Sequence, residues 1–270
     1  MILTIDCGNT NTVFALYSYK KIIKQQGCWR ISNNPKRTAD SYYSWLIQLL
    51  RSLKFDISDI SGVVIASVVP ESLFNIKSLI YKYIDIDPII VGEKGVKLDI
   101  EVNIEKPDEA GADRLVNSYA IKCLNLSPAI VIDFGTATTF DIVGKNGSYE
   151  GGIIAPGINL SLEALYLAAA RLPRISLKPL IGKKTLIGKN TINAMQSGIF
   201  WGYVSMIEGL IDKIKSIDDF NNFQVVATGG LSHLFKESIQ CIDLIEDNLT
   251  LIGLVNLFLT NKNINFEGLK

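Results

Sequence analysis

Two segments of the chain share one pattern, an apolar strand that ends in an aspartate and runs into a tight polar turn. One segment is Asp6–Val13 and the other is Asp133–Phe140. Aligned without gaps, they match at the aspartate, at a glycine two residues later and at one threonine, Thr12 and Thr139. These identities are weak alone, but the shared strand-turn-strand context favours two copies of one unit over chance.

The elements predicted around each turn follow the same order. Three strands, a helix, a strand, a helix and a strand are expected first, and largely the same series follows. We therefore predict an α/β protein with two similar lobes, 1–117 and 118–270, each built on a mixed β-sheet flanked by helices. No linker rich in Pro, Gly or Ser separates the lobes, so the helix expected near 108–125 should cross between them. Asp6, Asp133 and this helix are candidates to face one cleft, because active sites often lie where domains meet.

Composition and charge exclude several classes of function. Hydrophobic residues make up 48% and charged residues 20% of the chain, which is typical of a globular protein. Lys plus Arg (27) balances Asp plus Glu (27), which argues against broad nucleic-acid or anionic-membrane binding. The four cysteines form no Cys-x-x-Cys pair, and the single histidine, His233, excludes a multi-histidine metal site. We expect His233 to be an ordinary residue at a helix start.

Neither a signal peptide nor a membrane span is predicted. The N-terminus lacks a basic region followed by an apolar stretch. Apolar runs such as Leu251–Leu259 are too short to cross a bilayer. The scattered cysteines fit a reducing compartment, so we expect a cytoplasmic protein.

Both turns have the chemistry of a phosphate site. In Gly8–Thr12 and Gly135–Thr139, glycine allows backbone N–H groups to approach phosphate oxygens, and small hydroxyl and amide side chains add donors. Asp6 and Asp133 are placed at strand ends where a carboxylate can hold Mg²⁺ directly or through water. Neither turn matches a Walker loop or a dinucleotide fingerprint. Each turn alone could equally be a plain β-hairpin, whereas the two together favour phosphate binding.

These residues resemble the superfamily of acetate kinase, sugar kinases, heat-shock ATPases and actin, whose members have two RNase-H-like lobes and Asp-x-Gly-x-Thr phosphate loops. Within it, the chain is similar to the type III pantothenate kinase family from residue 2 to about residue 259. Each motif is modest alone, but the ordered set is specific. The motifs are Asp6–Thr12, Ser67–Pro70, Gly111–Arg114 with Asn117, Asp133–Asp141, Gly151–Gly157 and Thr228–Gly230.

The resemblance implies ATP-dependent phosphorylation of pantothenate to 4′-phosphopantothenate, the first step toward coenzyme A. By position it makes Asp113 the general base that accepts the proton of the pantothenate hydroxyl. Without the resemblance, Asp113 and Arg114 would be a solvated charged pair at a helix start. Substrate contacts are implied for Gly111, Ala112, Asp113, Arg114 and, from a loosely constrained region, Thr191. ATP contacts are implied for Asp6, Cys7, Gly8, Asn9, Thr10, Asn11, Thr12, Val13 and Thr136.

The resemblance also implies cofactors and an assembly. Asp133 matches a ligand of a monovalent cation, K⁺ or NH₄⁺, which the family requires besides the Mg²⁺ that accompanies ATP. Family members are usually homodimers with the substrate pocket at the subunit interface. The apolar residues between Leu160 and Leu172 could belong to that interface or to the core. One departure is Ile104, where many members have a tyrosine, which leaves the details of pantothenate contact open.

Two alternative functions remain open from the sequence. Another small-molecule kinase of the superfamily would need polar pocket residues of its own, and most of its sugar kinases are much longer. A nucleotide-binding regulatory protein without turnover is the second alternative. The presence of Asp6, Asp113 and Asp133 argues against a degenerate site of that kind.

Overall fold

The computed structural model describes residues 1–19, 22–168, 172–180 and 186–264, which form two compact units. The first unit contains Met1–Asn125 and the C-terminal segment from Leu249, and the second contains Leu126–Asn248. The sequence predicts the boundary between 117 and 118. That position falls inside the helix α3 (Ala112–Cys123), which stays whole in the first unit because it packs along α7 (Leu249–Asn261).

The first unit is built on a five-stranded mixed sheet. Its strands lie in the order β3-β2-β1-β4-β5. The pairs β1/β2 and β2/β3 are antiparallel, whereas β1/β4 and β4/β5 are parallel. The strands are β1 (Ile2–Cys7), β2 (Asn11–Ser18), β3 (Lys24–Ser32), β4 (Gly62–Ser67) and β5 (Ile89–Ile90).

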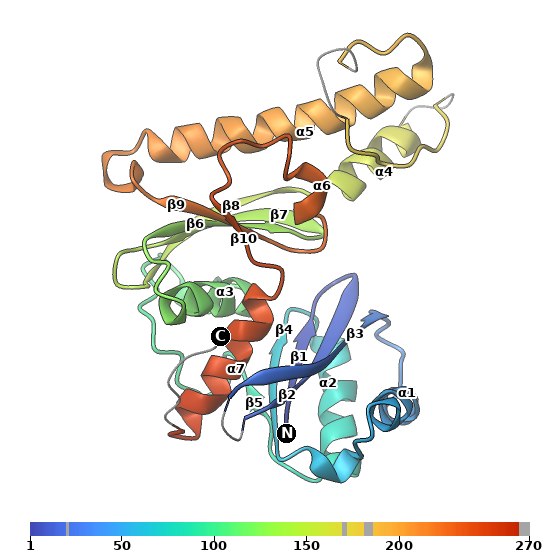
Figure 1. The fold of residues 1–270 in the computed structure, drawn as a ribbon, viewed down its shortest axis with the longest axis vertical. Coiled ribbons are helices and arrows are strands. Elements are labelled where there is room, and N and C mark those ends of the chain that lie inside the picture. Colours follow the sequence, from blue (N-terminus) through green and yellow to red (C-terminus); the bar gives the residue numbers. More distant parts are fainter. Residues whose placement is uncertain (20–21, 169–171, 181–185, 265–270) are drawn as a thin grey trace. The chain divides into compact units, whose positions relative to one another are not determined.

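Helices cover both faces of this sheet (Figure 1). Because side chains alternate along a strand, Leu3 and Ile5 of β1 pack against α1 (Ala39–Ser52) and α2 (Pro70–Leu79). Ile2 packs on the opposite face, against α3 and α7. Asp6 therefore lies on the α3/α7 face of β1, the face that also carries the start of the predicted substrate helix.

The second unit repeats the topology of the first. Its strand order is β10-β9-β6-β7-β8, with β6/β7 and β7/β8 antiparallel and β6/β9 and β9/β10 parallel. This duplication confirms the predicted fold class of two mixed sheets flanked by helices. The strands are β6 (Ala129–Phe134), β7 (Ala137–Val143), β8 (Tyr149–Pro156), β9 (Gln224–Thr228) and β10 (Leu244–Ile245).

One face of the second sheet packs against the long helix α5 (Thr191–Lys215) and the short helix α6 (Ser232–Phe235), as Figure 1 shows. Ile130, Ile132 and Phe134 of β6 point to this face. By alternation, Asp133 lies on the opposite face of the strand. The helix α4 (Ile158–Ala168) precedes α5. Within the apolar stretch between Leu160 and Leu172, residues 169–171 lie outside the described part of the chain, and Leu172 is not helical.

Several shorter elements refine the predicted boundaries. The helix α2 ends at Leu79 and is followed by a π-helical turn, Ile80–Ile84. Pro107 opens a separate 3₁₀ turn, Pro107–Glu109, rather than the substrate helix itself. The other 3₁₀ turns are Ile57–Asp59 and Asp218–Phe220. Among the residues described, no helix is both long enough and apolar enough to span a membrane.

Candidate active site

The first predicted phosphate turn connects β1 to β2. The N–H of Gly8 donates to the carbonyl oxygen of Asn11 at 3.0 Å and closes the turn, and Asn9 and Thr10 at its tip are exposed. A Cβ atom on Gly8 would lie 3.3 Å from that same carbonyl oxygen, which explains the small residue. The turn therefore presents two exposed residues at its tip, and the half-buried Asp6 lies in the strand that leads into it.

Two of the predicted ATP contacts are buried side chains. Cys7 and Thr12 face each other across the β1/β2 pair, and neither has exposed surface. The Thr12 hydroxyl donates to the Cys7 sulfur at 3.6 Å. These two residues therefore shape the base of the turn, and the direct ATP contacts predicted for them stay a prediction.

The second turn is one residue shorter than the first. The N–H of Gly135 donates to the carbonyl oxygen of Ala137 at 3.1 Å, and Asp133 pairs with Thr139. In the first turn Asp6 pairs with Val13. The alignment without gaps is therefore wrong by one position after the glycine, because it ignores this difference in turn length.

With one gap the repeat becomes clearer. Thr138, not Thr139, occupies the place of Thr12, and both are fully buried. The residues that follow them two positions later, Phe14 and Phe140, then also match and are both buried in the cores. The correct alignment adds an identity and strengthens the evidence for a duplicated unit.

A buried tyrosine anchors the second turn to α5. The hydroxyl groups of Thr138 and Tyr203 form a hydrogen bond. Burial raises the pKa of Tyr203 to about 12, and the negative charge of Asp133 acts in the same direction. The tyrosine therefore stays protonated at neutral pH and holds the first residues of β7 in place.

Two glycines allow other segments to pack directly on the second turn. A Cβ atom on Gly157 would lie 2.2 Å from the carbonyl oxygen of Thr136, and one on Gly229 would lie 2.5 Å from a carboxylate oxygen of Asp133. Gly229 also has a φ of +90°, which favours glycine. The motifs Gly151–Gly157 and Thr228–Gly230 thus end at the turn that carries Asp133 and Thr136.

The predicted substrate motif forms the start of α3. Gly111 is the residue before the helix, and Ala112 and Asp113 are its first two residues. The Asp113 carboxylate accepts a hydrogen bond from the N–H of Arg114 at 2.8 Å, and all three side chains from Ala112 to Arg114 are half-buried. A Cβ atom on Gly111 would lie 2.6 Å from that carboxylate oxygen. The helix N-terminus thus fixes one oxygen of Asp113 in a position electrostatically favourable for a carboxylate.

Contacts with α7 hold α3 in place. The hydroxyl of Thr250 donates to the side-chain oxygen of the buried Asn117 at 2.7 Å, one helical turn after Asp113. A Cβ atom on Gly253 would lie 2.5 Å from the carbonyl oxygen of Val116. Sequence reasoning missed Thr250 and Gly253, because they lie far along the chain in an apolar helix with no recognisable motif.

Thr191, the remaining predicted substrate contact, is the first residue of α5 and is exposed. The side chain of the preceding Asn190 accepts a hydrogen bond from the N–H of Asn193 at 2.9 Å and caps the helix. Neither packing nor a described partner fixes the role of Thr191, so its contact with the substrate stays a prediction.

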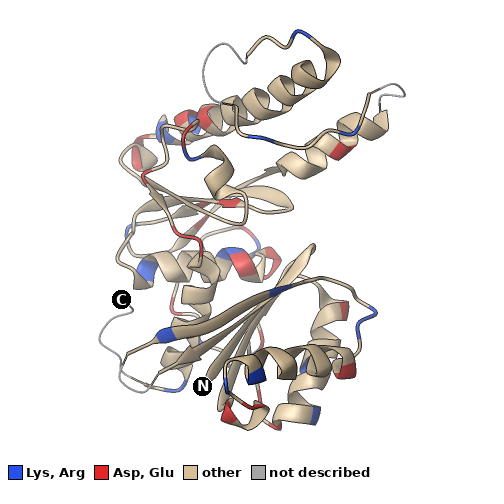
Figure 2. Cartoon of the chain, turned by 45° about the vertical axis from the view of Figure 1, so that its right-hand side comes forward, with Lys and Arg blue, Asp and Glu red and all other residues tan. Residues whose placement is uncertain are grey.

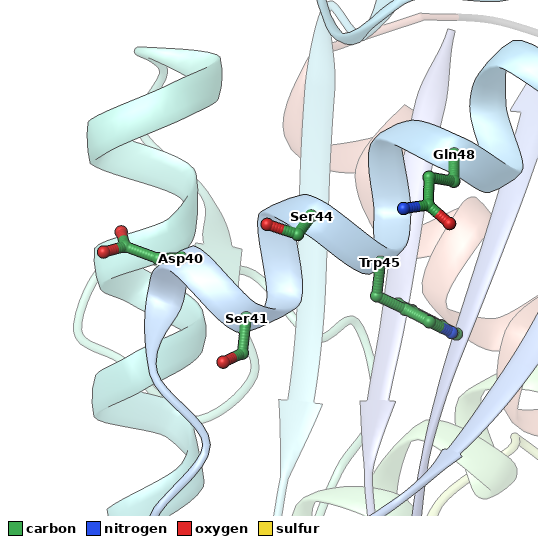
Figure 3. Close-up of a pocket in the computed structure, with 5 residues that line it drawn as sticks. All are labelled: Asp40, Ser41, Ser44, Trp45 and Gln48. Carbon is green, nitrogen blue, oxygen red and sulfur yellow. The ribbon is translucent and has the colours of Figure 1, made fainter.

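Two other polar features lie outside these motifs. A surface depression of about 520 Å³ lies along α1 and is lined by Asp40, Ser41, Ser44, Trp45 and Gln48 (Figure 3). His233 lies in α6, as expected for a helix-start residue, and contacts Asp247 at 2.8 Å on the surface. None of these residues belongs to either turn or to the start of α3, so we do not place the active site there.

Comparison with known proteins assigns the chain to a family. The profile of the type III pantothenate kinases matches residues 2–213. A type III pantothenate kinase from Caulobacter vibrioides is 47% identical over 261 residues, which cover 97% of this chain and 98% of that protein. The chain belongs to the type III pantothenate kinase family. The stretch matched by the family profile contains both turns and the start of α3.

Solved structures of more distant proteins share the fold of this type III pantothenate kinase family member. A Campylobacter jejuni protein described as a Baf family transcriptional activator superposes with a TM-score of 0.59 at 19% identity, covering 97% of this chain and 99% of that one. A Sinorhizobium meliloti protein assigned as a 2-dehydro-3-deoxygalactonokinase gives a TM-score of 0.58 at 12% identity, covering 99% of both chains. These similarities support the two-lobed kinase fold.

Proposed function

We propose that this chain catalyses ATP-dependent phosphorylation of pantothenate to 4′-phosphopantothenate, the first step of coenzyme A biosynthesis, in the cytoplasm. Membership of the type III pantothenate kinase family supports the reaction. The observation that carries the assignment is the half-buried Asp113 carboxylate, held by the N–H of Arg114 at the start of α3. The substrates are then pantothenate and ATP, and neither nucleic acid nor membrane is a partner.

ATP is bound through the two turns in this proposal. Phosphoryl transfer depends mainly on positioning and on stabilisation of charge, which backbone N–H groups in tight turns supply. Asn9 and Asn11 offer such groups in the first turn, and Thr10 adds a side-chain hydroxyl. The N–H of Gly8 closes the turn, so Gly8 contributes by allowing close approach of the phosphates, and Thr136 is the proposed contact in the second turn. Asp6, Cys7, Thr12 and Val13 hold the first turn at its base.

Pantothenate is bound beside the start of α3. Asp113 acts as the general base, because a carboxylate oxygen that is not engaged by the helix can accept the hydroxyl proton as the phosphoryl group arrives. Arg114 carries a permanent charge that suits a carboxylate or phosphate. Gly111 and Ala112 leave space for the substrate, and Thr191 adds a hydroxyl contact.

Mg²⁺ fits the donors that these turns provide. Among the described residues no group of three or more His, Cys, Asp or Glu is placed to hold a metal. Mg²⁺ with ATP does not need one, because it binds through one or two carboxylates, substrate phosphates and water. When bound, it neutralises charge on the phosphates. Asp6 is a candidate partner of Mg²⁺, and Asp133 is the proposed ligand of a monovalent cation, K⁺ or NH₄⁺.

A coupled assay for ADP tests the reaction. With ATP, Mg²⁺ and K⁺, we expect ADP formation that requires pantothenate and falls when Na⁺ replaces K⁺. The 4′-phosphopantothenate formed should equal the ADP in amount, as mass spectrometry can verify. ADP formation with a hexose in place of pantothenate would favour a sugar kinase, and nucleotide binding without turnover would favour a regulatory protein.

We also propose that the chain forms a homodimer through α4 and the first half of α5. Leu160 and Leu167 of α4 are 49% and 71% exposed, which favours an interface over core packing. Residues 191–207 of α5 carry no charge, and α4 carries only Glu163; Figure 2 colours the charged residues on the ribbon. Such an apolar surface fits the core of an interface.

Leu167→Glu is expected to weaken the dimer by at least about tenfold, because a charge without a partner would be buried in the interface. Light scattering after gel filtration over a range of concentrations measures the change. Phe74→Glu is a matched control, since Phe74 of α2 is also 71% exposed but lies in the other unit. Equal masses for both variants at every concentration would contradict the proposed interface.

A further inference from the structure

We propose that Asn33 is a positioning residue that orients the first phosphate turn for ATP, an inference that rests on the proposed function of that turn. Asn33 directly follows β3, the strand next to β2. Its backbone N–H donates to the carbonyl oxygen of Thr10 at 2.8 Å. Its side-chain amide donates to the carbonyl oxygen of Gly8 at 3.0 Å. One residue thus holds two carbonyl groups of the turn.

Holding these carbonyl groups fixes the direction of two backbone donors. In a trans peptide unit, the C=O of one residue and the N–H of the next lie in one plane and point in opposite directions. The carbonyl of Gly8 points to Asn33, so the N–H of Asn9 points away from it. The carbonyl of Thr10 also points to Asn33, so the N–H of Asn11 points away as well. These are two of the donors proposed for the ATP phosphates.

A buried serine fixes the orientation of the Asn33 amide. The hydroxyl of Ser72 donates to the side-chain oxygen of Asn33 at 2.7 Å, and Ser72 is only 1% exposed. An amide that accepts a hydrogen bond at its oxygen must turn its NH₂ group to the other partner, which is Gly8. Ser72 lies in the first turn of α2, two residues after Pro70, which ends the motif Ser67–Pro70. That motif thus connects to the phosphate turn through Asn33.

In the second unit, the residue equivalent to Asn33 also packs against the carbonyl groups of its turn. Asn11 pairs with Ser32, and its equivalent Ala137 pairs with Pro156, so Gly157 is the equivalent of Asn33. The site of a Cβ atom on Gly157 lies 2.2 Å and 2.7 Å from the carbonyl oxygens of Thr136 and Gly135, the counterparts of the two carbonyls that Asn33 holds. The longer turn is held by a side chain, whereas the shorter turn is held by direct packing of glycine.

Asn33→Ala tests this role, because it removes the amide and keeps the backbone N–H. We expect the Kd of a non-hydrolysable ATP analogue, measured by calorimetry, to rise about three- to tenfold, as for the loss of one neutral hydrogen bond. KM for ATP should rise similarly, whereas KM for pantothenate should not change. Asn33→Asp should weaken ATP binding at least as much, because it keeps the bond from Ser72 but turns an oxygen toward the carbonyl of Gly8.

Asn75→Ala is the matched control. Its amide donates to the carbonyl oxygen of Pro35 at 2.9 Å, so it also ties the segment after β3 to α2 but does not contact the turn. If Asn33→Ala binds the analogue as Asn75→Ala does, while both lower Tm, the role of Asn33 is structural only and the inference is overturned. Ser72→Ala should also raise the Kd of the ATP analogue, but by less than Asn33→Ala. Binding of the analogue by Asn33→Asp with wild-type affinity would also overturn the inference.

The binding measurement separates this inference from the proposed reaction. If wild-type protein binds the analogue and Asn33→Ala binds it more weakly, but no pantothenate-dependent ADP forms, the positioning role stands and the proposed substrate is wrong. If pantothenate is phosphorylated and Asn33→Ala has a normal KM for ATP, only the positioning role is wrong. A wild-type protein that does not bind the analogue would overturn both.

Discussion

Asp113→Asn is expected to lower kcat by about 100- to 10,000-fold, the usual contribution of a general base. Asparagine cannot accept the hydroxyl proton, but it retains a side-chain oxygen that can accept the hydrogen bond from the N–H of Arg114. The start of α3 should therefore keep its conformation. Steady-state kinetics should show the loss in kcat, and calorimetry should show unchanged affinity for an ATP analogue.

Asp40→Asn provides a matched control for this substitution. Asp40 is the second residue of α1 and follows Ala39, as Asp113 is the second residue of α3 and follows Ala112. Its carboxylate bonds to Lys82 and Tyr83 on the surface and takes no part in either turn. We expect a kcat within about twofold of the wild-type value, because surface ion pairs contribute little. A kcat for Asp113→Asn that is as high as for Asp40→Asn would exclude Asp113 as the base.

Gly157→Ala is expected to have the second largest effect, a fall of about 100-fold in kcat/KM for ATP. The added Cβ atom would lie 2.2 Å from the carbonyl oxygen of Thr136 and 2.7 Å from that of Gly135. Both are backbone atoms of the second turn, so the turn itself must move. Displacement of a phosphate-binding segment by about 1 Å is enough for a loss of this size. Kinetics with varied ATP, together with a thermal melt, measure the effect.

Gly209→Ala controls for the gain of a methyl group. Gly209 lies within α5, and a Cβ atom there would have nothing within 4 Å. Alanine should increase the free energy of unfolding by about 0.5–1 kcal/mol, because glycine is a poor helix former, and kcat/KM should not change. Normal kcat/KM for ATP in Gly157→Ala would show that the second turn does not position the nucleotide.

The duplicated fold could be predicted from the sequence because its signals are local. Apolar strands that end in Asp6 and Asp133, each followed by a glycine turn, fix the start of both sheets. The difference in turn length could not be predicted in the same way, because it appears only in the pairing of strands. The register pairs Thr12 with Cys7 but Thr139 with Asp133. A comparison without gaps cannot detect that change.

The contacts that support the candidate site were harder to predict. Asp113 and its neighbours form a recognisable motif, and the structure places them at a helix start as expected. Asn33 and Thr250 carry no such signal. Each acts on a segment distant in the chain, Asn33 on the turn at Gly8 and Thr250 on α3 at Asn117. Contacts of this kind depend on tertiary packing, which neither propensity nor periodicity encodes.

The return of α7 to the first unit also constrains how the chain folds during synthesis. Domains generally form as the chain emerges, with the N-terminal part first. Here the α3/α7 face of the first sheet, including Ile2 and Val64, stays without the part of its cover that α7 provides until residues 249–261 have been made. The second unit is continuous over Leu126–Asn248 and can be completed earlier. We therefore expect the apolar surface of the first unit on which α7 packs to stay exposed longest in the nascent chain. Chaperones should bind mainly to that surface.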